Sequence, residues 1–347
     1  MKIKIGDLTK IRTGKLDANA SSEDGQYPFF TCSRESLKIS TYSYDCECVL
    51  VAGNGDLNVK YYNGKFDAYQ RTYIIEDNGS GKLFMPYLYY FMEGYVEELR
   101  KQAIGGVIKY IKLGNLTDAL IKLPSVDEQK AIVDILEKAK NVLDMRNEEI
   151  SKFDELIKAR FVEMFGDTVT NPFGWEEHRL DEYIDFLTSG SRGWAQYFVE
   201  DENELFITIK NVKNNHITLE NIQYIETPDN KEAERTKVKS GDLLISITAD
   251  LGRTGVVDDD IAEKGAYINQ HLSLVRLNKK KVNPLYVSYF LETEGGKMQF
   301  ESKNQNGVKA GLNFDAIKSL KILVPPLEKQ EAYLAFVHQV DKSKVVA

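Results

Sequence analysis

Residues 106–129, GVIKYIKLGNLTDALIKLPSVDEQ, recur as residues 307–330, GVKAGLNFDAIKSLKILVPPLEKQ, without a gap and 201 positions later. Seven of the 24 aligned pairs exchange one apolar residue for another or Asp for Glu. The identical pairs are Gly106/Gly307, Val107/Val308, Ile121/Ile322, Pro124/Pro325 and Gln129/Gln330. A period this long is too large for a solenoid repeat. The sequence therefore predicts two copies of one domain, each followed by the same element.

A long helix is predicted to begin where the repeated block ends. Pro124 interrupts the preceding pattern, and residues 127–129 place acidic and amide side chains where a helix N-terminus favours them. Ten positions, eight of them apolar, then follow at alternating steps of four and three, which is the period of a coiled-coil seam. The seam positions are Ile132, Leu136, Ala139, Leu143, Arg146, Ile150, Phe153, Ile157, Arg160 and Met164. We expect a helix over residues 127–165, about 57 Å long, that ends at Gly166.

The second copy starts a helix in the same way, after Pro325 and Pro326. Tyr333, Val337 and Val340 stand at the positions of Ile132, Leu136 and Ala139 in the first copy. Because the sequence ends at Ala347, we expect this second helix to be about half as long as the first. Two helices that leave equivalent points of two domains are expected to pair antiparallel, with the domains at opposite ends.

The segments before the two helices are predicted to be similar mixed domains, which gives an α+β fold class with an internal pseudo-two-fold repeat. Short strands bounded by glycine turns are predicted at 48–52, 72–75, 242–248 and 272–277. Helical stretches rich in aromatic residues are predicted at 86–92 and 284–291, and we interpret these aromatics as core residues. The expected order is a first domain at 1–123, a first spacer helix at 124–166, a second domain at 167–323 and a second spacer helix at 324–347.

Composition indicates an ordinary cytoplasmic protein. The chain is 42% hydrophobic and 28% charged, and no apolar run approaches the roughly 20 residues that cross a bilayer. Its three cysteines, Cys32, Cys46 and Cys48, do not form the even-numbered pattern of a disulfide framework. With four scattered histidines, a zinc site is not expected. The net charge of −8 argues against a surface that is entirely basic, but it leaves room for a local basic groove.

The architecture resembles that of the specificity subunit of bacterial type I restriction-modification enzymes. The resemblance rests on the duplication, its spacing, and a Leu-Pro or Pro-Pro pair before an acidic-Gln segment at each helix start. The linker Met164-Phe165-Gly166-Asp167, followed by NPFGWE at 171–176, is also similar to the entry into that family's second target-recognition domain. The resemblance covers essentially the whole chain. The short second helix departs from the family pattern.

The resemblance implies a DNA-binding subunit without catalysis of its own. Each domain would read one half of a split double-stranded DNA target, and the helices would set the gap between the halves. The resemblance also implies docking of two modification subunits that use S-adenosylmethionine, and of restriction subunits that use ATP and Mg. The alternative is a coiled-coil protein-interaction scaffold, related to specificity subunits, that does not bind a DNA sequence.

Polar loops adjoin predicted strands at matching places in both copies. Reading a sequence requires donors and acceptors that enter a groove, and anchoring phosphates requires Lys, Arg and backbone amides. The candidates in the first copy are Asn54, Asn58, Lys60, Gln70, Arg71, Gly105, Gly106 and Lys109. Those in the second copy are Arg192, Lys210, Thr248, Asp250, Arg253, Asn269, Gln270, Asn306, Gly307 and Lys309. The competing interpretation is that these residues form hairpins and turns.

The matched segments Tyr69-Gln70-Arg71 and Asn269-Gln270-His271 provide the most specific signal, because Gln can pair with adenine and Arg with guanine. A structural turn is again the alternative, and we interpret His271 as a turn or surface residue. Neither a dinucleotide fingerprint nor a P-loop is present. The Asn-Pro pairs at 171–172 and 283–284 lack the Pro-aromatic continuation of adenine methyltransferases. Methylation would therefore come from another chain.

Overall fold

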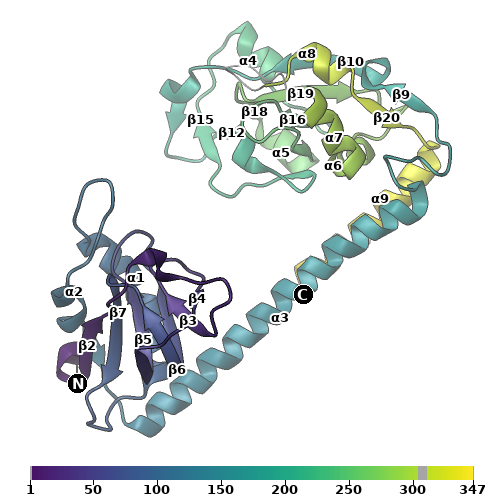
Figure 1. Cartoon of the computed structure of the whole chain (residues 1–347). Helices are drawn as coiled ribbons and strands as arrows, with labels where there is room; N and C mark the ends of the chain where they lie inside the picture. The colour runs from purple at the N-terminus through teal and green to yellow at the C-terminus, as the bar shows by residue number, and fades with distance from the viewer. Residues whose placement is uncertain (1, 304–310, 347) are drawn as a thin grey trace. The chain divides into compact units, whose positions relative to one another are not determined.

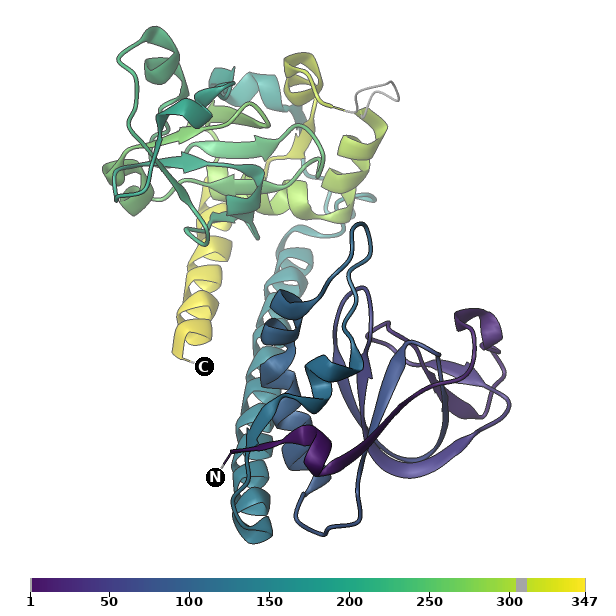
Figure 2. The same cartoon turned by 90° about the vertical axis from the view of Figure 1, so that its left-hand side faces the viewer.

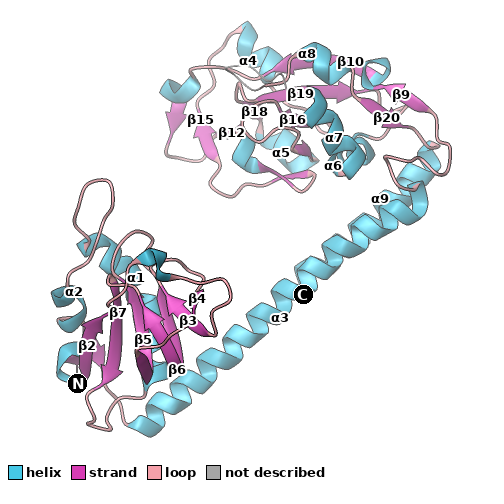
Figure 3. Cartoon of the chain, in the orientation of Figure 1, coloured by secondary structure: helices cyan, strands magenta, loops and turns pink. Residues whose placement is uncertain are grey.

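The computed structural model describes residues 2–303 and 311–346. Contacts divide the chain into two units, Met1–Met145 and Arg146–Ala347, and each unit mixes helices with sheets (Figures 1 and 3). Helix α3 (Val126–Phe165) begins in unit 1 and continues without a break into unit 2. None of the helices described is both long and apolar enough to span a bilayer.

Unit 1 is built on a six-stranded sheet with the order β2-β7-β5-β6-β3-β4. Its strands are β2 (Thr9–Thr13), β3 (Tyr27–Phe30), β4 (Leu37–Ile39), β5 (Tyr44–Ala52), β6 (Val59–Ala68) and β7 (Thr72–Asp77). Neighbouring strands are antiparallel except β3 and β6, which are parallel. Two 3₁₀ turns, η1 (Ile5–Asp7) and η2 (Ala18–Ala20), flank β2. Helix α1 (Met85–Gln102) covers one face of the sheet, where Leu88, Met92 and Leu99 are fully buried. Strands curl away from α1 around a second, smaller core (Figure 2).

Unit 2 has a similar plan, but its strands form two four-stranded sheets. Its first sheet has the order β10-β19-β16-β17, formed by β10 (Ile184–Ser189), β16 (Leu243–Ser246), β17 (Thr254–Val256) and β19 (Leu272–Leu277). Its second has the order β11-β15-β12-β18, formed by β11 (Phe198–Val199), β12 (Glu204–Ile207), β15 (Gln223–Ile225) and β18 (Ala266–Ile268). The parallel pair β12 and β18 corresponds to β3 and β6 of unit 1. Unit 2 also contains the hairpin β13 (Val212–Lys213) and β14 (His216–Ile217). Its 3₁₀ turns are η3 (Leu180–Tyr183), η4 (Trp194–Tyr197) and η5 (Ile209–Asn211). Its helices include α4 (Lys231–Thr236), α5 (Asp259–Lys264), α6 (Pro284–Glu292) and α7 (Glu294–Lys303).

The repeated sequence block forms the closing part of each unit. In unit 1 it contains α2 (Leu113–Thr117) and β8 (Leu120–Lys122), which pairs with β1 (Lys2–Lys4). In unit 2 it contains α8 (Phe314–Lys318) and β20 (Lys321–Leu323), which pairs with β9 (Glu177–Arg179). Ile121 and Ile322, identical in the two copies, are both fully buried in these ladders. The strands predicted around residues 48–52, 72–75, 242–248 and 272–277, and the helices predicted at 86–92 and 284–291, are confirmed as β5, β7, β16, β19, α1 and α6.

Helix α3 follows the prediction at both ends. At its start, Ser125 and Glu128 form a capping box, in which the Glu128 carboxylate accepts hydrogen bonds from Ser125 N (2.8 Å) and Oγ (2.7 Å). At its end, Gly166 adopts φ 81°, and a Cβ there would lie 2.8 Å from Pro172. A left-handed glycine therefore stops the helix and lets the next loop approach closely.

Within unit 2, the last turns of α3 pair with helix α9 (Leu327–Val346). Tyr333 stacks edge-on against Phe161 and Phe165, while Lys344 Nζ lies 2.8 Å from Asp154 Oδ1. Since later residues of α9 meet earlier residues of α3, the two helices are antiparallel, as predicted. Five of the predicted seam residues are covered at this contact: Ile157, Tyr333, Val337 and Val340 are buried, and Phe153 is half-buried.

The middle of α3 differs from the part that packs against α9. Ile132, Leu136, Ala139, Leu143 and Ile150 are all exposed, and Leu143 has 63% of its surface accessible. In unit 1 the buried side chains of α3 are Gln129 and Val133, which lie one turn apart. The buried stripe of the helix is therefore interrupted between the turns that pack on unit 1 and the turns that pack on α9.

Candidate nucleic-acid interface

Four polar loops of unit 1 come together at one end of its sheet, and they are joined by backbone hydrogen bonds. The loops are residues 14–17, 53–58, 69–71 and 104–110. The bonds are Gly14 N to Thr72 O (3.0 Å), Gln70 N to Leu16 O (2.8 Å), Gly53 N to Arg71 O (2.8 Å), Ile111 N to Gly53 O (2.9 Å) and Gly55 N to Lys109 O (3.0 Å). The three candidate segments of the first copy, which are separate in sequence, thus form one surface.

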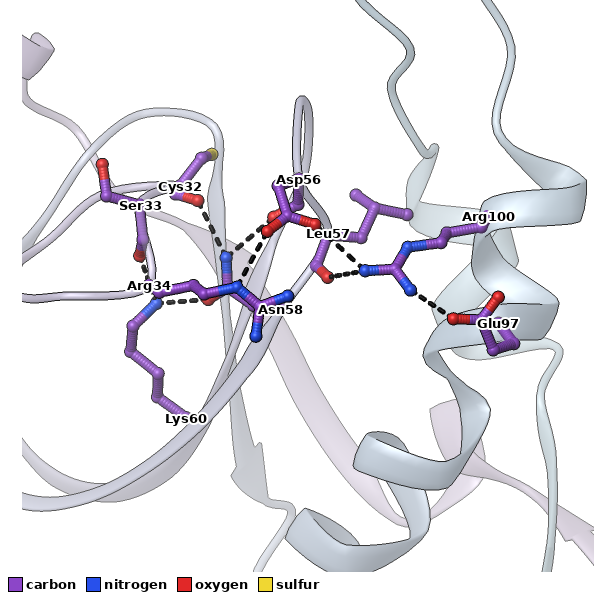
Figure 4. A network of polar contacts seen from close by, with 9 residues as sticks. All are labelled: Cys32, Ser33, Arg34, Asp56, Leu57, Asn58, Lys60, Glu97 and Arg100. Atoms are coloured by element: carbon purple, nitrogen blue, oxygen red, sulfur yellow. Dashed lines mark hydrogen bonds and ion pairs between the residues drawn. The ribbon is translucent and has the colours of Figure 1, made fainter. Parts of the chain in front are cut away.

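A polar network anchors one side of this surface (Figure 4). At its centre, Asp56 forms ion pairs with Arg34 (2.9 Å) and with Arg100 (3.0 Å). Arg100 also donates to Leu57 O and pairs with Glu97. The Arg34 guanidinium, followed by that of Arg100, lowers the pKa of the Asp56 carboxyl below its usual value. Asp56 therefore stays charged and holds two arginines in place.

Asn58 and Lys60 are held inside this network. Asn58 is 8% exposed, and its amide group donates to Cys32 O and Asp56 O. Lys60 is half-buried and donates to Ser33 O and to the Asn58 side chain. Burial lowers the pKa of its ammonium group. The amide hydrogens of Asn58 therefore hold the loop in this structure, and its contact with DNA stays a prediction. Lys60 likewise points its ammonium group into the protein.

The other candidates of unit 1 lie at the surface. Gln70 is exposed, and its Nε2 donates to Asp17 Oδ1 at 3.1 Å. Arg71 and Lys109 are exposed, and Asn54 is half-exposed beside Tyr110. The remaining two candidates are glycines with different requirements. Gly105 has φ 120°, and a Cβ there would lie 2.6 Å from Ile108 O, whereas Gly106 has no neighbour within 4 Å.

Unit 2 assembles its loops through the same hydrogen-bond pattern. The bonds are Gly190 N to Leu272 O (3.0 Å), Gln270 N to Ser191 O (2.9 Å), Ile247 N to His271 O (2.9 Å) and Leu312 N to Ile247 O (2.9 Å). They correspond in turn to the bonds made by Gly14, Gln70, Gly53 and Ile111 of unit 1. Gln70 and Gln270 therefore occupy equivalent positions, as their sequence context suggested.

Four side chains of this second surface form a continuous chain of hydrogen bonds. Arg192 Nε donates to Gln270 Oε1, Gln270 Nε2 lies 3.2 Å from His271 Nε2, and His271 Nδ1 lies 2.7 Å from Thr248 Oγ1. The structure thus brings together three predicted residues, Arg192, Thr248 and Gln270. The fourth, His271, was predicted to be only a turn or surface residue.

The remaining candidates of unit 2 have more local roles. Asp250 forms an ion pair with Arg253, and Asn269 Oδ1 accepts from His271 N at 3.2 Å. Lys210 is exposed in η5, which follows β12 at the end of the sheet where Asn269 lies. Asn306, Gly307 and Lys309 lie outside the described residues. In the part of the chain that is described, no group of three His, Cys, Asp or Glu side chains could hold a metal ion.

Sequence reasoning missed Asp17 and Arg34. Arg34 follows β3 and has 69% of its side chain exposed, but no repeat of its surroundings marked it. Asp17 was overlooked because an acidic residue is not expected beside phosphates. A signal was present, since each of the equivalent strands β2 and β10 ends in a hydroxyl residue and is followed by a glycine, Thr13-Gly14 and Ser189-Gly190.

The chain matches a family model described as the type I restriction modification DNA specificity domain, over residues 1–152 and 172–345. The EcoDI specificity subunit of the type I restriction enzyme from Escherichia coli is 38% identical over 156 residues, which make up 45% of this chain and 34% of that protein. The MjaVIII specificity subunit from Methanocaldococcus jannaschii is 21% identical over 98% of this chain and 85% of its own length. The chain thus spans only about a third of the EcoDI subunit, and 66% of the related EcoBI subunit of Escherichia coli.

The fold has a counterpart among solved structures. The crystal structure of the type I restriction-modification system S subunit from M. genitalium superposes with a TM-score of 0.60 over 99% of this chain and 90% of that one, at 14% sequence identity. At this identity the likeness concerns the fold alone. The family model covers most of both units and most of helices α3 and α9. This chain therefore belongs to the family of type I restriction-modification DNA specificity domains.

Proposed function

We propose that this chain is the DNA-recognition subunit of a type I restriction-modification complex and reads a target in two separate halves. Each unit would bind one half-site of double-stranded DNA through its loop surface. The chain itself would perform no catalysis. The observation that carries the proposal is the duplicated loop surface, in which Gln70 and Gln270 are held by equivalent backbone bonds.

The chemistry of the two surfaces suits DNA. Glutamine, arginine and threonine side chains read base edges in the major groove, and lysines and backbone amides bind phosphates. Both loop surfaces combine these types: Gln70, Arg71 and Lys109 in unit 1, and Arg192, Thr248 and Gln270 in unit 2 are half-exposed or exposed. A net charge of −8 restricts such binding to local surfaces of this kind.

The proposed partners follow from the exposed side chains of α3 and from the family. Apolar side chains such as Ile135, Val142 and Met145 are more than half exposed on this helix, and exposed apolar patches commonly mark protein interfaces. We assign them to contacts with two modification subunits, which would supply S-adenosylmethionine-dependent methylation. Restriction subunits that use ATP and Mg would join that complex.

The test is to co-express the chain with its modification subunit and to map methylated adenines in the modified DNA. The expected result is a split motif with two fixed half-sequences and one fixed gap. A parallel selection from a randomised duplex pool, performed at two salt concentrations, should enrich the same motif. If no split motif emerges although the complex assembles, the chain is instead a protein-interaction scaffold, and the proposed function is wrong.

A further inference from the structure

One position is duplicated between the units but carries opposite hydrogen-bonding groups. Gln70 N donates to Leu16 O in unit 1, and Gln270 N donates to Ser191 O in unit 2. Parallel β-bridges join equivalent pairs of residues in the two units, Leu16 with Tyr69 and Ser191 with Asn269. The next residue along each loop contacts the glutamine side chain. That residue is Asp17 in unit 1 and Arg192 in unit 2.

The hydrogen-bond directions in unit 2 follow from Arg192. An arginine side chain has donors only, so Gln270 must turn its Oε1 toward Arg192 and its Nε2 toward His271. His271 then accepts at Nε2 and carries its proton on Nδ1, which donates to Thr248 Oγ1. The series of hydrogen bonds therefore runs in one direction, and it fixes the plane of the Arg192 guanidinium through Nε.

In unit 1 the hydrogen bond at the equivalent position runs the other way, because the glutamine donates instead of accepting. The Asp17 carboxylate has acceptors only, so Gln70 turns its Nε2 toward Asp17 Oδ1. Asp17 is exposed, and its second oxygen is not used by Gln70. The outward group at this position is therefore an acceptor in unit 1. In unit 2 it is a donor fork, because the terminal nitrogens of the exposed Arg192 meet no acceptor within residues 2–303 and 311–346.

These two groups fit different base edges. A guanidinium fork pairs with O6 and N7 of guanine, whereas a carboxylate accepts from the amino group of cytosine or adenine. An aspartate near DNA is repelled by phosphates, so a DNA-binding loop tolerates Asp17 where donors face it. Gln70 Nε2 donates to one carboxylate oxygen, and a base amino group would donate to the other.

We propose that Asp17 and Arg192 are the specificity-determining residues at one equivalent position of the two half-sites, and that Gln70 and Gln270 are positioning residues that orient them. Unit 2 reads a guanine through Arg192, and unit 1 reads a base amino group through Asp17. This inference rests on the proposed DNA recognition. It explains how one duplicated surface reads two different sequences.

The first experiment determines the split motif selected by the full chain with its modification subunit, for the wild type and for two variants. Asp17→Asn retains the oxygen that accepts from Gln70 but turns an amino group outward. We expect one position of the unit 1 half-site to change from a base with an amino group to one with an acceptor, while the other half-site is unchanged. Arg192→Lys retains the charge but lacks the fork, so we expect the guanine preference at one position of the other half-site to fall about tenfold.

The second experiment tests the positioning role of Gln270. Gln270→Glu still offers an oxygen to Arg192 Nε, so the guanine preference should persist even if affinity falls. Gln270→Leu removes that acceptor, so the guanine preference should be lost. A residue needed only for packing would not separate these two variants in base preference. Lys210→Gln serves as the control, because loss of an exposed lysine should weaken binding without changing any base preference.

The outcomes separate this inference from the proposed function. A wild-type chain that selects no split motif overturns both. A wild-type split motif that stays the same in Asp17→Asn and Arg192→Lys overturns the inference and leaves the proposed function standing. A change in both half-sites from a single substitution also overturns it, because each residue is assigned to one unit.

Discussion

Gln129 and Gln330 each join the start of a long helix to its own domain. Gln129 Oε1 accepts from Phe84 N at 2.8 Å, and its Nε2 donates to Lys82 O and Pro124 O. Gln330 Oε1 accepts from Asn283 N at 2.9 Å, and its Nε2 donates to Pro325 O. Both glutamines are fully buried. Because Phe84 and Asn283 precede α1 and α6, each glutamine links the starts of two helices, which gives a physical reason for its identity in the two copies.

Replacing either glutamine by leucine should destabilise the chain by about 2 kcal/mol. The leucine has a similar volume but leaves Phe84 N or Asn283 N, and the carbonyl oxygens opposite, buried without a partner. Urea unfolding followed by circular dichroism measures the loss. The matched control is Gln26→Leu, because Gln26 is exposed. If Gln129→Leu and Gln26→Leu unfold at the same urea concentration, the buried amide does not contribute as stated.

At the scale of single residues, the sequence predicts which residues recur in the two copies. It does not predict which of their polar atoms already form hydrogen bonds within the protein. The repeat identified Gln70 and Gln270, and the structure places them at equivalent positions. Asn58 has a residue type suited to a base edge, yet its amide hydrogens are used within the protein. Asp17 has an unfavourable charge for a DNA site, and its contact with Gln70 shows its place in the loop surface. Such contacts join residues distant in sequence, so they cannot be derived from local pattern.

At the scale of elements, α3 shows how much of a helix the period of its apolar residues can predict. Its start and end depend on neighbouring residues, Ser125 with Glu128 and Gly166 with Pro172, and sequence predicts such local signals well. The period of 3.5 shows which side chains share a face but not what covers that face. The covered part of the predicted seam begins near Phe153, where α9 packs.

The contact between α9 and α3 should weaken in acid. Asp341 contacts His216 and Lys344, and Lys344 in turn pairs with Asp154 of α3. The hydrogen bond from His216, followed by that from Lys344, lowers the pKa of Asp341 to about 2. A lowered pKa in the folded state contributes stability that is present above the unfolded value near 4 and is lost as pH falls toward 2. After screening by solvent, we expect the contribution to be about 1 kcal/mol.

Urea unfolding of Asp341→Asn and the wild type at a series of pH values tests this expectation. The variant should be less stable above pH 5, and the difference should shrink steadily between pH 4 and pH 2. Asp229→Asn is the control, because Asp229 is exposed and has no ion pair within the described residues. A difference between Asp341→Asn and the wild type that does not depend on pH would show that the Asp341 carboxylate does not contribute through its charge.

At the scale of the whole molecule, the duplication is clearest in the sequence where the two copies form the same local structure. The gapless block contains a ladder strand, a helix start and a buried glutamine, which tolerate little change. The segments before it differ, since unit 2 has a second sheet whose strands are two to four residues long. Strands this short are stabilised by distant partners rather than by their own residues. Their arrangement could not be predicted from local pattern, although the mixed fold class could.

The continuity of α3 leads to the last prediction. Because the helix runs unbroken across the unit boundary, we expect a four-residue insertion after Ala139 to alter the gap between half-sites and neither half-sequence. The insertion adds about 6 Å of helix and about 40° of rotation beyond a full turn. The added length matches the rise of about two base pairs of DNA, whereas the added rotation matches the twist of about one base pair. Because the two do not agree, the gap should lengthen by one or two base pairs and binding should weaken. The same insertion after Ser80, in an exposed turn, is the control. Methylation mapping reads both outcomes, and an unchanged gap with undiminished binding after the Ala139 insertion would show that α3 does not set the spacing.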